Sequence, residues 1–125
     1  MGMLFEKGPL QQDTGLLNER WGQDGSKIVN ISTTLGNVGA TVYTVTTNKK
    51  LFVKSIIIIT TSADGDSFTL KDGSAGTNRL SYELPTTIGI ANTVVFDTPI
   101  IFEDAIYYNP SGGPNININI TGWEE

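Results

Sequence analysis

Residues 115–120 read NININI, a strict alternation of asparagine and isoleucine close to the end of the 125-residue chain. Successive side chains of an extended strand point to opposite faces, so this stretch predicts a strand with one apolar face and one amide face. Ile116, Ile118 and Ile120 form the predicted core face. Burial on one side only is typical of antiparallel sheets, so the stretch favours an antiparallel β fold.

The amide face of this strand, Asn115, Asn117 and Asn119, has two interpretations. Asn is depleted in strands because its side chain competes for backbone hydrogen bonds, and Thr, Lys or Glu would be more usual on a solvated face. On the first interpretation the amides face only water, where Asn needs no protein partner. On the second they form a polar contact surface for another chain, which makes these three residues candidate interface residues.

The rest of the chain after residue 27 also carries strand signals. Short runs rich in Ile, Val, Thr, Phe and Tyr alternate with turns that contain Gly, Asp, Pro and Ser. Neither a helical period nor an internal repeat is visible. The sequence predicts about eight strands, with a break near Glu103. They are expected at residues 28–35, 41–47, 50–62, 67–72, 78–84, 92–98, 99–108 and 115–123.

The run at residues 51–59, LFVKSIIII, is apolar on both of its predicted faces. One face would form the core, and the other would need cover from the N-terminal arm, a loop or another subunit. The run therefore predicts a homo-oligomer. Regular alternation gives the two faces as Leu51, Val53, Ile57 and Ile59, and Phe52, Ile56 and Ile58.

These signals together predict an all-β fold, a two-sheet antiparallel β-sandwich. A jelly roll is the leading topology and an immunoglobulin-like sandwich the runner-up. Residues 28–125 are the predicted sandwich domain, and residues 1–27 an extended N-terminal arm without a sustained strand or helix period. The arm carries more apolar side chains than a solvated tail needs, so we expect it to dock on a neighbour. Its candidate interface residues are Leu4, Phe5, Leu10, Leu16, Leu17 and Trp21.

Composition argues against several classes of function. The net charge is −5 and the eight Lys and Arg residues are scattered, so nucleic acid is not an expected partner. No stretch approaches the ~20 apolar residues of a membrane span, and the N-terminus lacks the apolar core of a signal peptide, so no membrane association is expected. Charged residues make up 17% of the chain, against about 25% in typical soluble domains. Such a surface suits a subunit of an assembly or an extracellular β-domain.

The chain contains no His and no Cys. This removes the commonest general base, the His-containing nucleophilic arrangements and thiolate metal ligands. We therefore predict no enzyme activity, no catalytic, cofactor-binding or metal-ligating residue, and no small-molecule substrate. The sequence Asp64-Gly65-Asp66 is interpreted as a hairpin turn, with a calcium loop as the weaker alternative, because Ca²⁺ needs about six to eight oxygen ligands. Glu103-Asp104 and Glu124-Glu125 are interpreted as solvated acids.

The aromatic side chains suit either packing or stacking against sugar rings. Tyr107 and Tyr108 are adjacent on a predicted strand and must point to opposite faces, so at least one ring lies outside the core or at its edge. Both are candidate interface residues. Trp123 is a further aromatic residue that a glycan-binding site could use.

Three strand-like segments together resemble a known group of proteins: KLFVKSIIII at residues 50–59, FTLKDG at 68–73 and FDTPIIF at 96–102. They are similar to small β-sandwich or jelly-roll virion proteins of tailed bacteriophages, most of all to capsid decoration (cement) proteins. This resemblance is a pattern of strands over residues 41–123. It implies a structural protein made in the host cytoplasm that binds the major capsid protein on the outside of the virion, as a homotrimer. Related patterns occur in tail, baseplate and fibre modules, so a receptor- or glycan-binding module is the alternative.

Overall fold

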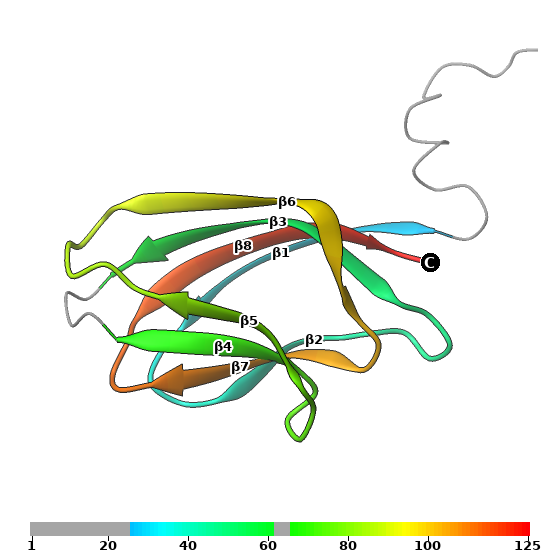
Figure 1. The fold of residues 1–125 in the computed structure, drawn as a ribbon, viewed down its shortest axis with the longest axis horizontal. Helices are drawn as coiled ribbons and strands as arrows, with labels where there is room; N and C mark the ends of the chain where they lie inside the picture. The colour runs from blue at the N-terminus through cyan, green and yellow to red at the C-terminus, as the bar shows by residue number, and fades with distance from the viewer. Residues whose placement is uncertain (1–25, 62–65) are drawn as a thin grey trace, which may run out of the picture.

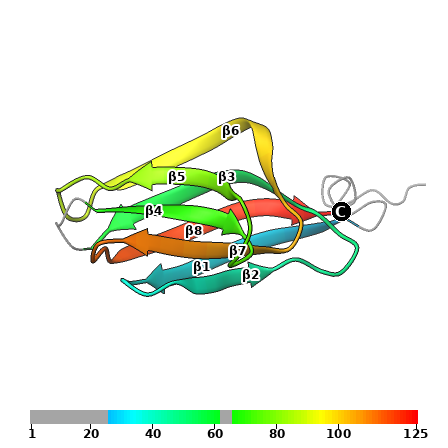
Figure 2. The same ribbon diagram turned by 60° about the horizontal axis from the view of Figure 1, so that its bottom comes forward.

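The computed structural model describes residues 26–61 and 66–125, which form two antiparallel sheets of four strands each (Figure 1). One sheet has the strand order β1-β8-β3-β6 and the other β2-β7-β4-β5, and the two sheets lie face to face as layers (Figure 2). The predicted all-β sandwich is confirmed. The strands are β1 (Lys27–Leu35), β2 (Ala40–Thr44), β3 (Leu51–Thr60), β4 (Ser67–Asp72), β5 (Asn78–Glu83), β6 (Ala91–Phe102), β7 (Ala105–Ser111) and β8 (Ile116–Glu124).

The strand pairing gives the jelly-roll topology. β1 pairs with β8, β2 with β7, β3 with β6 and β4 with β5, each time antiparallel. Such nested pairs result when one long hairpin is rolled up so that its two ends lie side by side, which is the jelly-roll arrangement. The leading topology of the sequence analysis is therefore the observed one, and the immunoglobulin-like alternative does not fit this strand order.

The core lies between the two sheets and is built from their inward side chains. Ile116, Ile118 and Ile120 of β8 are at most 1% exposed, as the NININI alternation predicts. Tyr108 and Phe68 from the other sheet pack against each other, with their ring centroids 5.4 Å apart. Burying each such large apolar side chain contributes about 1.5–3 kcal/mol, so these inward faces hold the sandwich together.

A β-bulge at Lys54 changes which side chains of β3 face the core. Val53 lies opposite Gly122 of β8 and Ser55 opposite the next residue, Thr121, so Lys54 is an extra residue on β3. An extra residue reverses the alternation of every side chain that follows it. The predicted faces of residues 51–59 are therefore wrong after the bulge. The inward side chains are Leu51, Val53, Ile56 and Ile58, and the outward ones are Phe52, Ile57 and Ile59.

Strand β6 runs through Pro99 instead of ending before it. The sequence analysis predicted two strands, 92–98 and 99–108, whereas the structure has one strand to Phe102 and a turn at Glu103 and Asp104. Because Val53 pairs with Ile100 and Ser55 with Val95, the residues between Val95 and Ile100 lie outside the ladder with β3. Proline is tolerated there because no ladder hydrogen bond is lost on this edge strand. β6 bends sharply along its length in Figure 1.

Candidate assembly interface

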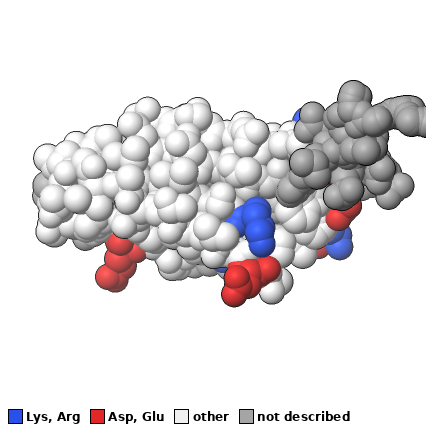
Figure 3. All heavy atoms as spheres, turned by 90° about the horizontal axis from the view of Figure 1, so that it is seen from above, with Lys and Arg blue, Asp and Glu red and all other residues white. Residues whose placement is uncertain are grey.

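The outward side of the sheet β1-β8-β3-β6 is a broad uncharged surface, which we call the outer face. The strand register arranges its side chains in rows that cross the four strands. Figure 3 looks down on this sheet and shows mainly uncharged atoms. Lys54, at the bulge, and Asp97, two residues after Val95 on β6, are charged residues beside these rows. The outer face consists of Ile28, Asn30, Ser32 and Thr34 of β1, Asn117, Asn119, Thr121 and Trp123 of β8, Phe52, Ser55, Ile57 and Ile59 of β3, and Ala91, Thr93, Val95 and Ile101 of β6.

One end of the outer face carries an apolar row. Ile28 lies opposite Trp123, Trp123 opposite Phe52, and Phe52 opposite Ile101. The rings of Phe52 and Trp123 are stacked, with centroids 5.3 Å apart and an interplanar angle of 8°. Ile28 is 44% exposed and Ile101 36% exposed. The described residues therefore leave part of this apolar row uncovered.

The other end of the outer face carries the amides of the NININI stretch. Asn119 lies between Ser32 and Ile57, and Asn117 lies between Thr34 and Ile59. The Thr34 hydroxyl donates a 2.9 Å hydrogen bond to Oδ1 of Asn117. This bond involves the amide oxygen and not the amide nitrogen. The amides therefore form a neutral surface that offers both donors and acceptors.

A small pocket opens at the apolar end of the outer face, and we call it the Trp123 pocket. Its volume is about 160 Å³. Nζ of Lys54 donates a 2.9 Å hydrogen bond to the carbonyl oxygen of Phe96. This bond links Lys54 to the part of β6 that lies outside the ladder with β3. The pocket is lined by Ile28, Asn30, Lys54, Thr121, Gly122 and Trp123.

The structure separates the two tyrosines predicted at an interface. Tyr107 is half-buried on β7, whereas Tyr108 is 0% exposed and its hydroxyl donates a 2.8 Å hydrogen bond to the carbonyl oxygen of Gly36. Placing Tyr108 at an interface was therefore wrong, because its ring fills the core and its one polar group is satisfied inside the chain. The two rings point to opposite faces, as their adjacency predicts.

Two of the three candidate asparagines, Asn117 and Asn119, lie on the outer face. Asn115, Asn117 and Asn119 are exposed, and Asn115 directly precedes β8. Their contact with another chain stays a prediction. Residues 1–25 lie outside the described residues, so the division into arm and sandwich and the roles of the arm residues also stay predictions. The arm residues concerned are Leu4, Phe5, Leu10, Leu16, Leu17 and Trp21.

Glu124 is a buried carboxylate that sequence analysis interpreted as solvated. It is 2% exposed. Its Oε2 accepts hydrogen bonds from the Tyr43 hydroxyl at 2.7 Å and the Thr46 backbone N–H at 2.9 Å, and its Oε1 accepts one from the Thr46 hydroxyl at 2.8 Å. Burial alone would raise the pKa of Glu124, but these bonds and the charge of Lys27 lower it on balance. Burial and the nearby carboxylate raise the pKa of Tyr43 to about 12.

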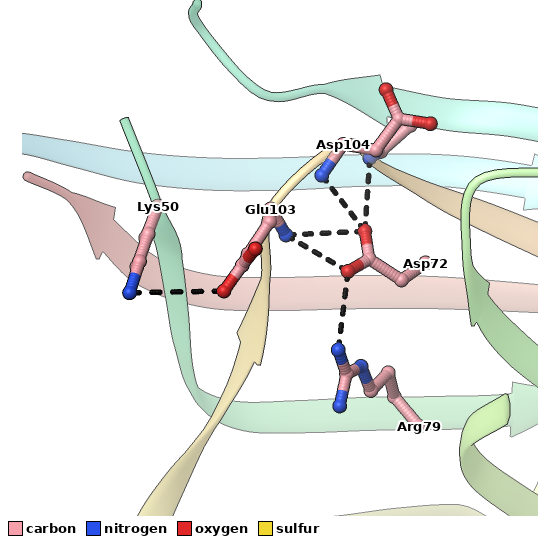
Figure 4. Close-up of polar contacts among 6 residues, drawn as sticks. Lys50, Asp72, Arg79, Glu103 and Asp104 are labelled. Atoms are coloured by element: carbon pink, nitrogen blue, oxygen red, sulfur yellow. Dashed lines mark hydrogen bonds and ion pairs between the residues drawn. The ribbon is translucent and has the colours of Figure 1, made fainter. Parts of the chain in front are cut away.

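A second carboxylate, Asp72, holds the turn between β6 and β7 (Figure 4). It accepts hydrogen bonds from the backbone N–H groups of Glu103, Asp104 and Ala105, the shortest being 2.8 Å from Asp104, and Nη2 of Arg79 lies 3.3 Å away. Burial would raise the pKa of Asp72, but the backbone N–H groups and Arg79 lower it on balance. Glu103 itself is exposed and pairs with Lys50 at 3.7 Å, a surface pair that contributes little.

The acidic residues thus build turns and hold sheets together. Asp66 accepts a 2.7 Å hydrogen bond from the backbone N–H of Gly113, while Asp64 and Gly65 lie outside the described residues. Within residues 26–61 and 66–125, no group of three or more Asp or Glu side chains is placed to hold a metal ion. In the same part of the chain, no helix is long and apolar enough to cross a membrane.

Comparisons with known proteins give distant likenesses to solved structures. No family model and no curated protein matches the chain. One similar solved structure is a virus-like particle of the extra small virus of the giant freshwater prawn Macrobrachium rosenbergii, with a TM-score of 0.38, 9% identity, and coverage of 78% of this chain and 77% of that one. Another is infectious bursal disease virus, Gx strain, with a TM-score of 0.25, 12% identity, and coverage of 79% and 28%. Both structures come from viruses. At these scores neither likeness carries an argument about function.

Proposed function

We propose that this protein is a non-enzymatic structural subunit of a bacteriophage virion, which binds the capsid exterior as a decoration protein. The observation that carries the proposal is the uncharged outer face of the sheet β1-β8-β3-β6. The strand pattern that resembles decoration proteins also supports it, and so does the jelly-roll sandwich on which that pattern lies. On this proposal the chain forms a homotrimer and contacts the major capsid protein.

The side chains of the outer face suit a protein contact. The buried centres of protein interfaces are depleted in charged residues, because desolvating a charge costs more than its pairing returns. Thr, Ser and Asn keep hydrogen-bonding capacity without that cost, while Ile57, Ile59 and Val95 add apolar area. Val95 is 62% exposed, a large value for a side chain of this kind on a sheet. The outer face therefore offers both apolar burial and neutral hydrogen bonding to a neighbour.

On this proposal, a contact made by the amides of β8 explains why Asn alternates with Ile in the NININI stretch. Each amide can accept a hydrogen bond and donate one, so a row of amides can pair with a neighbour's backbone without burying charge. One such bond contributes about 0.5–1.5 kcal/mol net, and an amide left unpaired at a contact costs more than that. The row thus favours a partner of matching geometry over other surfaces.

Cosedimentation with capsids tests the proposal. The chain is expressed with the major capsid protein of the same virus, and the assembled particles are purified. We expect the wild-type chain to sediment with the particles in a fixed ratio. The outer-face variant (Asn115→Asp, Asn117→Asp and Asn119→Asp together) should be lost from them, because it places three like charges at the contact.

A matched control separates this effect from a general effect of charge. Asn78→Asp, Ser81→Asp and Asn109→Asp together add the same charge at exposed positions of the other sheet, on β5 and β7. This control variant should sediment with particles as the wild type does. If the wild-type chain stays in the supernatant, or if both variants bind equally well, the outer face does not mediate capsid binding.

Glycan binding is the second candidate function, and the Trp123 pocket is the observation that favours it. The indole lies beside the polar side chains of Asn30 and Thr121, a combination that could stack on a sugar ring and hydrogen-bond to its hydroxyls. However, Trp123 is stacked against Phe52 on one face, so only its remaining surface could contact a sugar. Glycan-array binding that disappears with Trp123→Ala would support this alternative.

A further inference from the structure

We propose that the Trp123 pocket is the docking site for a leucine side chain from the N-terminal segment of the same chain, supplied by Leu16 or Leu17. The segment would fold back over the apolar row, instead of docking on a neighbour as the sequence analysis expects, and would leave the amide end of the outer face open. This inference does not rest on the virion role, since it concerns an isolated chain.

The pocket has the size and walls of a site for a single side chain. Its volume of about 160 Å³ is well below the ~300 Å³ at which typical small-molecule sites begin. Ile28 and Trp123 supply apolar walls, and Gly122 adds backbone without a side chain. Ile28 remains 44% exposed among the described residues, so a further apolar group would gain burial here. An aliphatic side chain fits this environment better than a polar ligand does.

The point at which the described chain begins makes its own N-terminal segment the nearest occupant. β1 starts at Lys27, and two of its first residues, Ile28 and Asn30, line the pocket. Leu17 precedes Ser26 by about nine residues, and a stretch of that length spans up to roughly 30 Å when extended. A short tether gives an effective concentration in the millimolar range, so an own-chain leucine outcompetes one from another molecule at ordinary protein concentrations.

Charge also favours this segment. Its acidic side chains outnumber its basic ones, four to two. The charged residue that lines the Trp123 pocket is a cation, Lys54. Glu19 follows the leucine pair by two positions, so it would lie close to Lys54 when a leucine fills the pocket. Opposite charges at the rim of an apolar contact fix the orientation in which it forms. The acidic and basic residues of the segment are Glu6, Asp13, Glu19 and Asp24, and Lys7 and Arg20.

Disulfide trapping in the full-length chain tests the proposal. The chain has no native Cys, so a disulfide can form only between the two introduced thiols. Asn18→Cys leaves both leucines intact, and Asn30→Cys places the second thiol on a pocket-lining residue. A disulfide requires Cα atoms about 4.4–6.8 Å apart, so it forms quickly only if the segment reaches the pocket. We expect an intramolecular disulfide under mild oxidation, read as a faster-migrating monomer on a non-reducing gel and by peptide mapping.

Two comparisons distinguish docking from random contact of a tethered segment. Leu16→Ser and Leu17→Ser in the same background should slow trapping by about tenfold, because the apolar side chain that holds the segment is gone. Moving the second thiol to Ser32→Cys, an exposed position further along the same face of β1, should slow it as well. Equal trapping rates in all three proteins would overturn the proposal. Disulfides formed between chains, at the expense of those within a chain, would overturn docking on the same chain.

Discussion

Glu124 of β8 is a buried carboxylate whose hydrogen bonds come from Tyr43 and Thr46. The alternation that buries Ile116, Ile118 and Ile120 also turns positions 122 and 124 inward, so the burial of Glu124 could have been predicted from the NININI pattern. Its partners could not, because Tyr43 and Thr46 are distant in sequence and come close only through the sheet packing. A buried carboxylate is tolerated here because three hydrogen bonds replace its lost hydration.

Glu124→Gln should destabilise the fold and change its pH dependence. The pKa of Glu124 in the folded chain lies below the ordinary value of 4.5, so its stabilising effect is present above that pH and is lost as the pH falls through the folded value. Replacing the charged acceptor should cost about 1.5–3 kcal/mol at pH 7. Urea unfolding at pH 7 and at pH 3 checks this: the difference between wild type and variant should shrink at the lower pH. An equal difference at both values would contradict the charged role of Glu124.

Ile118→Ala tests the core face of the same strand. The side chain is 1% exposed, so its loss should leave a cavity and cost about 2–5 kcal/mol of unfolding free energy. Asn119→Ala, its exposed neighbour, is the matched control and should change the unfolding free energy by less than about 0.5 kcal/mol. Denaturant unfolding of both variants measures the contrast. Similar losses in the two would mean that the alternation of β8 is not as described.

At the scale of the elements, most strands follow the sequence pattern, and the departures have local causes. The clean alternation at 67–72, 78–84 and 115–123 predicted β4, β5 and β8 to within one or two residues. The predicted faces of β3 were wrong after Lys54, because nothing in KSIIII marks Lys54 as an extra residue. The bulge can be recognised only from the pairing of β3 with its neighbours β6 and β8. The predicted end of β6 at residue 98 was wrong, because Pro99 indicates a strand end unless the strand is known to lie at the edge of a sheet.

Gly122→Ala should destabilise the bulge between β3 and β8. A Cβ atom at this position would overlap the backbone oxygen of Phe52, which cannot move without shifting β3. Overpacking of this kind typically costs about 1–3 kcal/mol or more. The thermal midpoint of Gly122→Ala should fall well below that of Thr121→Ala, an exposed neighbour on the same strand. If the two midpoints agree, the close approach of the strands at the bulge is not a constraint on this position.

At the scale of the whole molecule, the sequence predicted a two-sheet sandwich and a contact role for the amides. It did not predict which side chains share the outer face. The outer face exists only because β1, β8, β3 and β6 come together, and these strands are far apart in the chain. Its apolar row likewise joins Ile28, Phe52, Ile101 and Trp123 from four separate segments. Periodicity identifies which way one strand faces, whereas the composition of a face depends on strand order.

The oligomeric mass of the isolated protein tests the central claim, that the outer face is an assembly surface. Multi-angle light scattering at micromolar concentration should give the wild-type chain a mass that is a multiple of the 13.5 kDa subunit, three-fold on the trimer proposal. The outer-face variant should give a 13.5 kDa monomer that stays folded, while the control variant keeps the wild-type mass. A 13.5 kDa wild-type monomer, or an outer-face variant with the wild-type mass, would contradict the account.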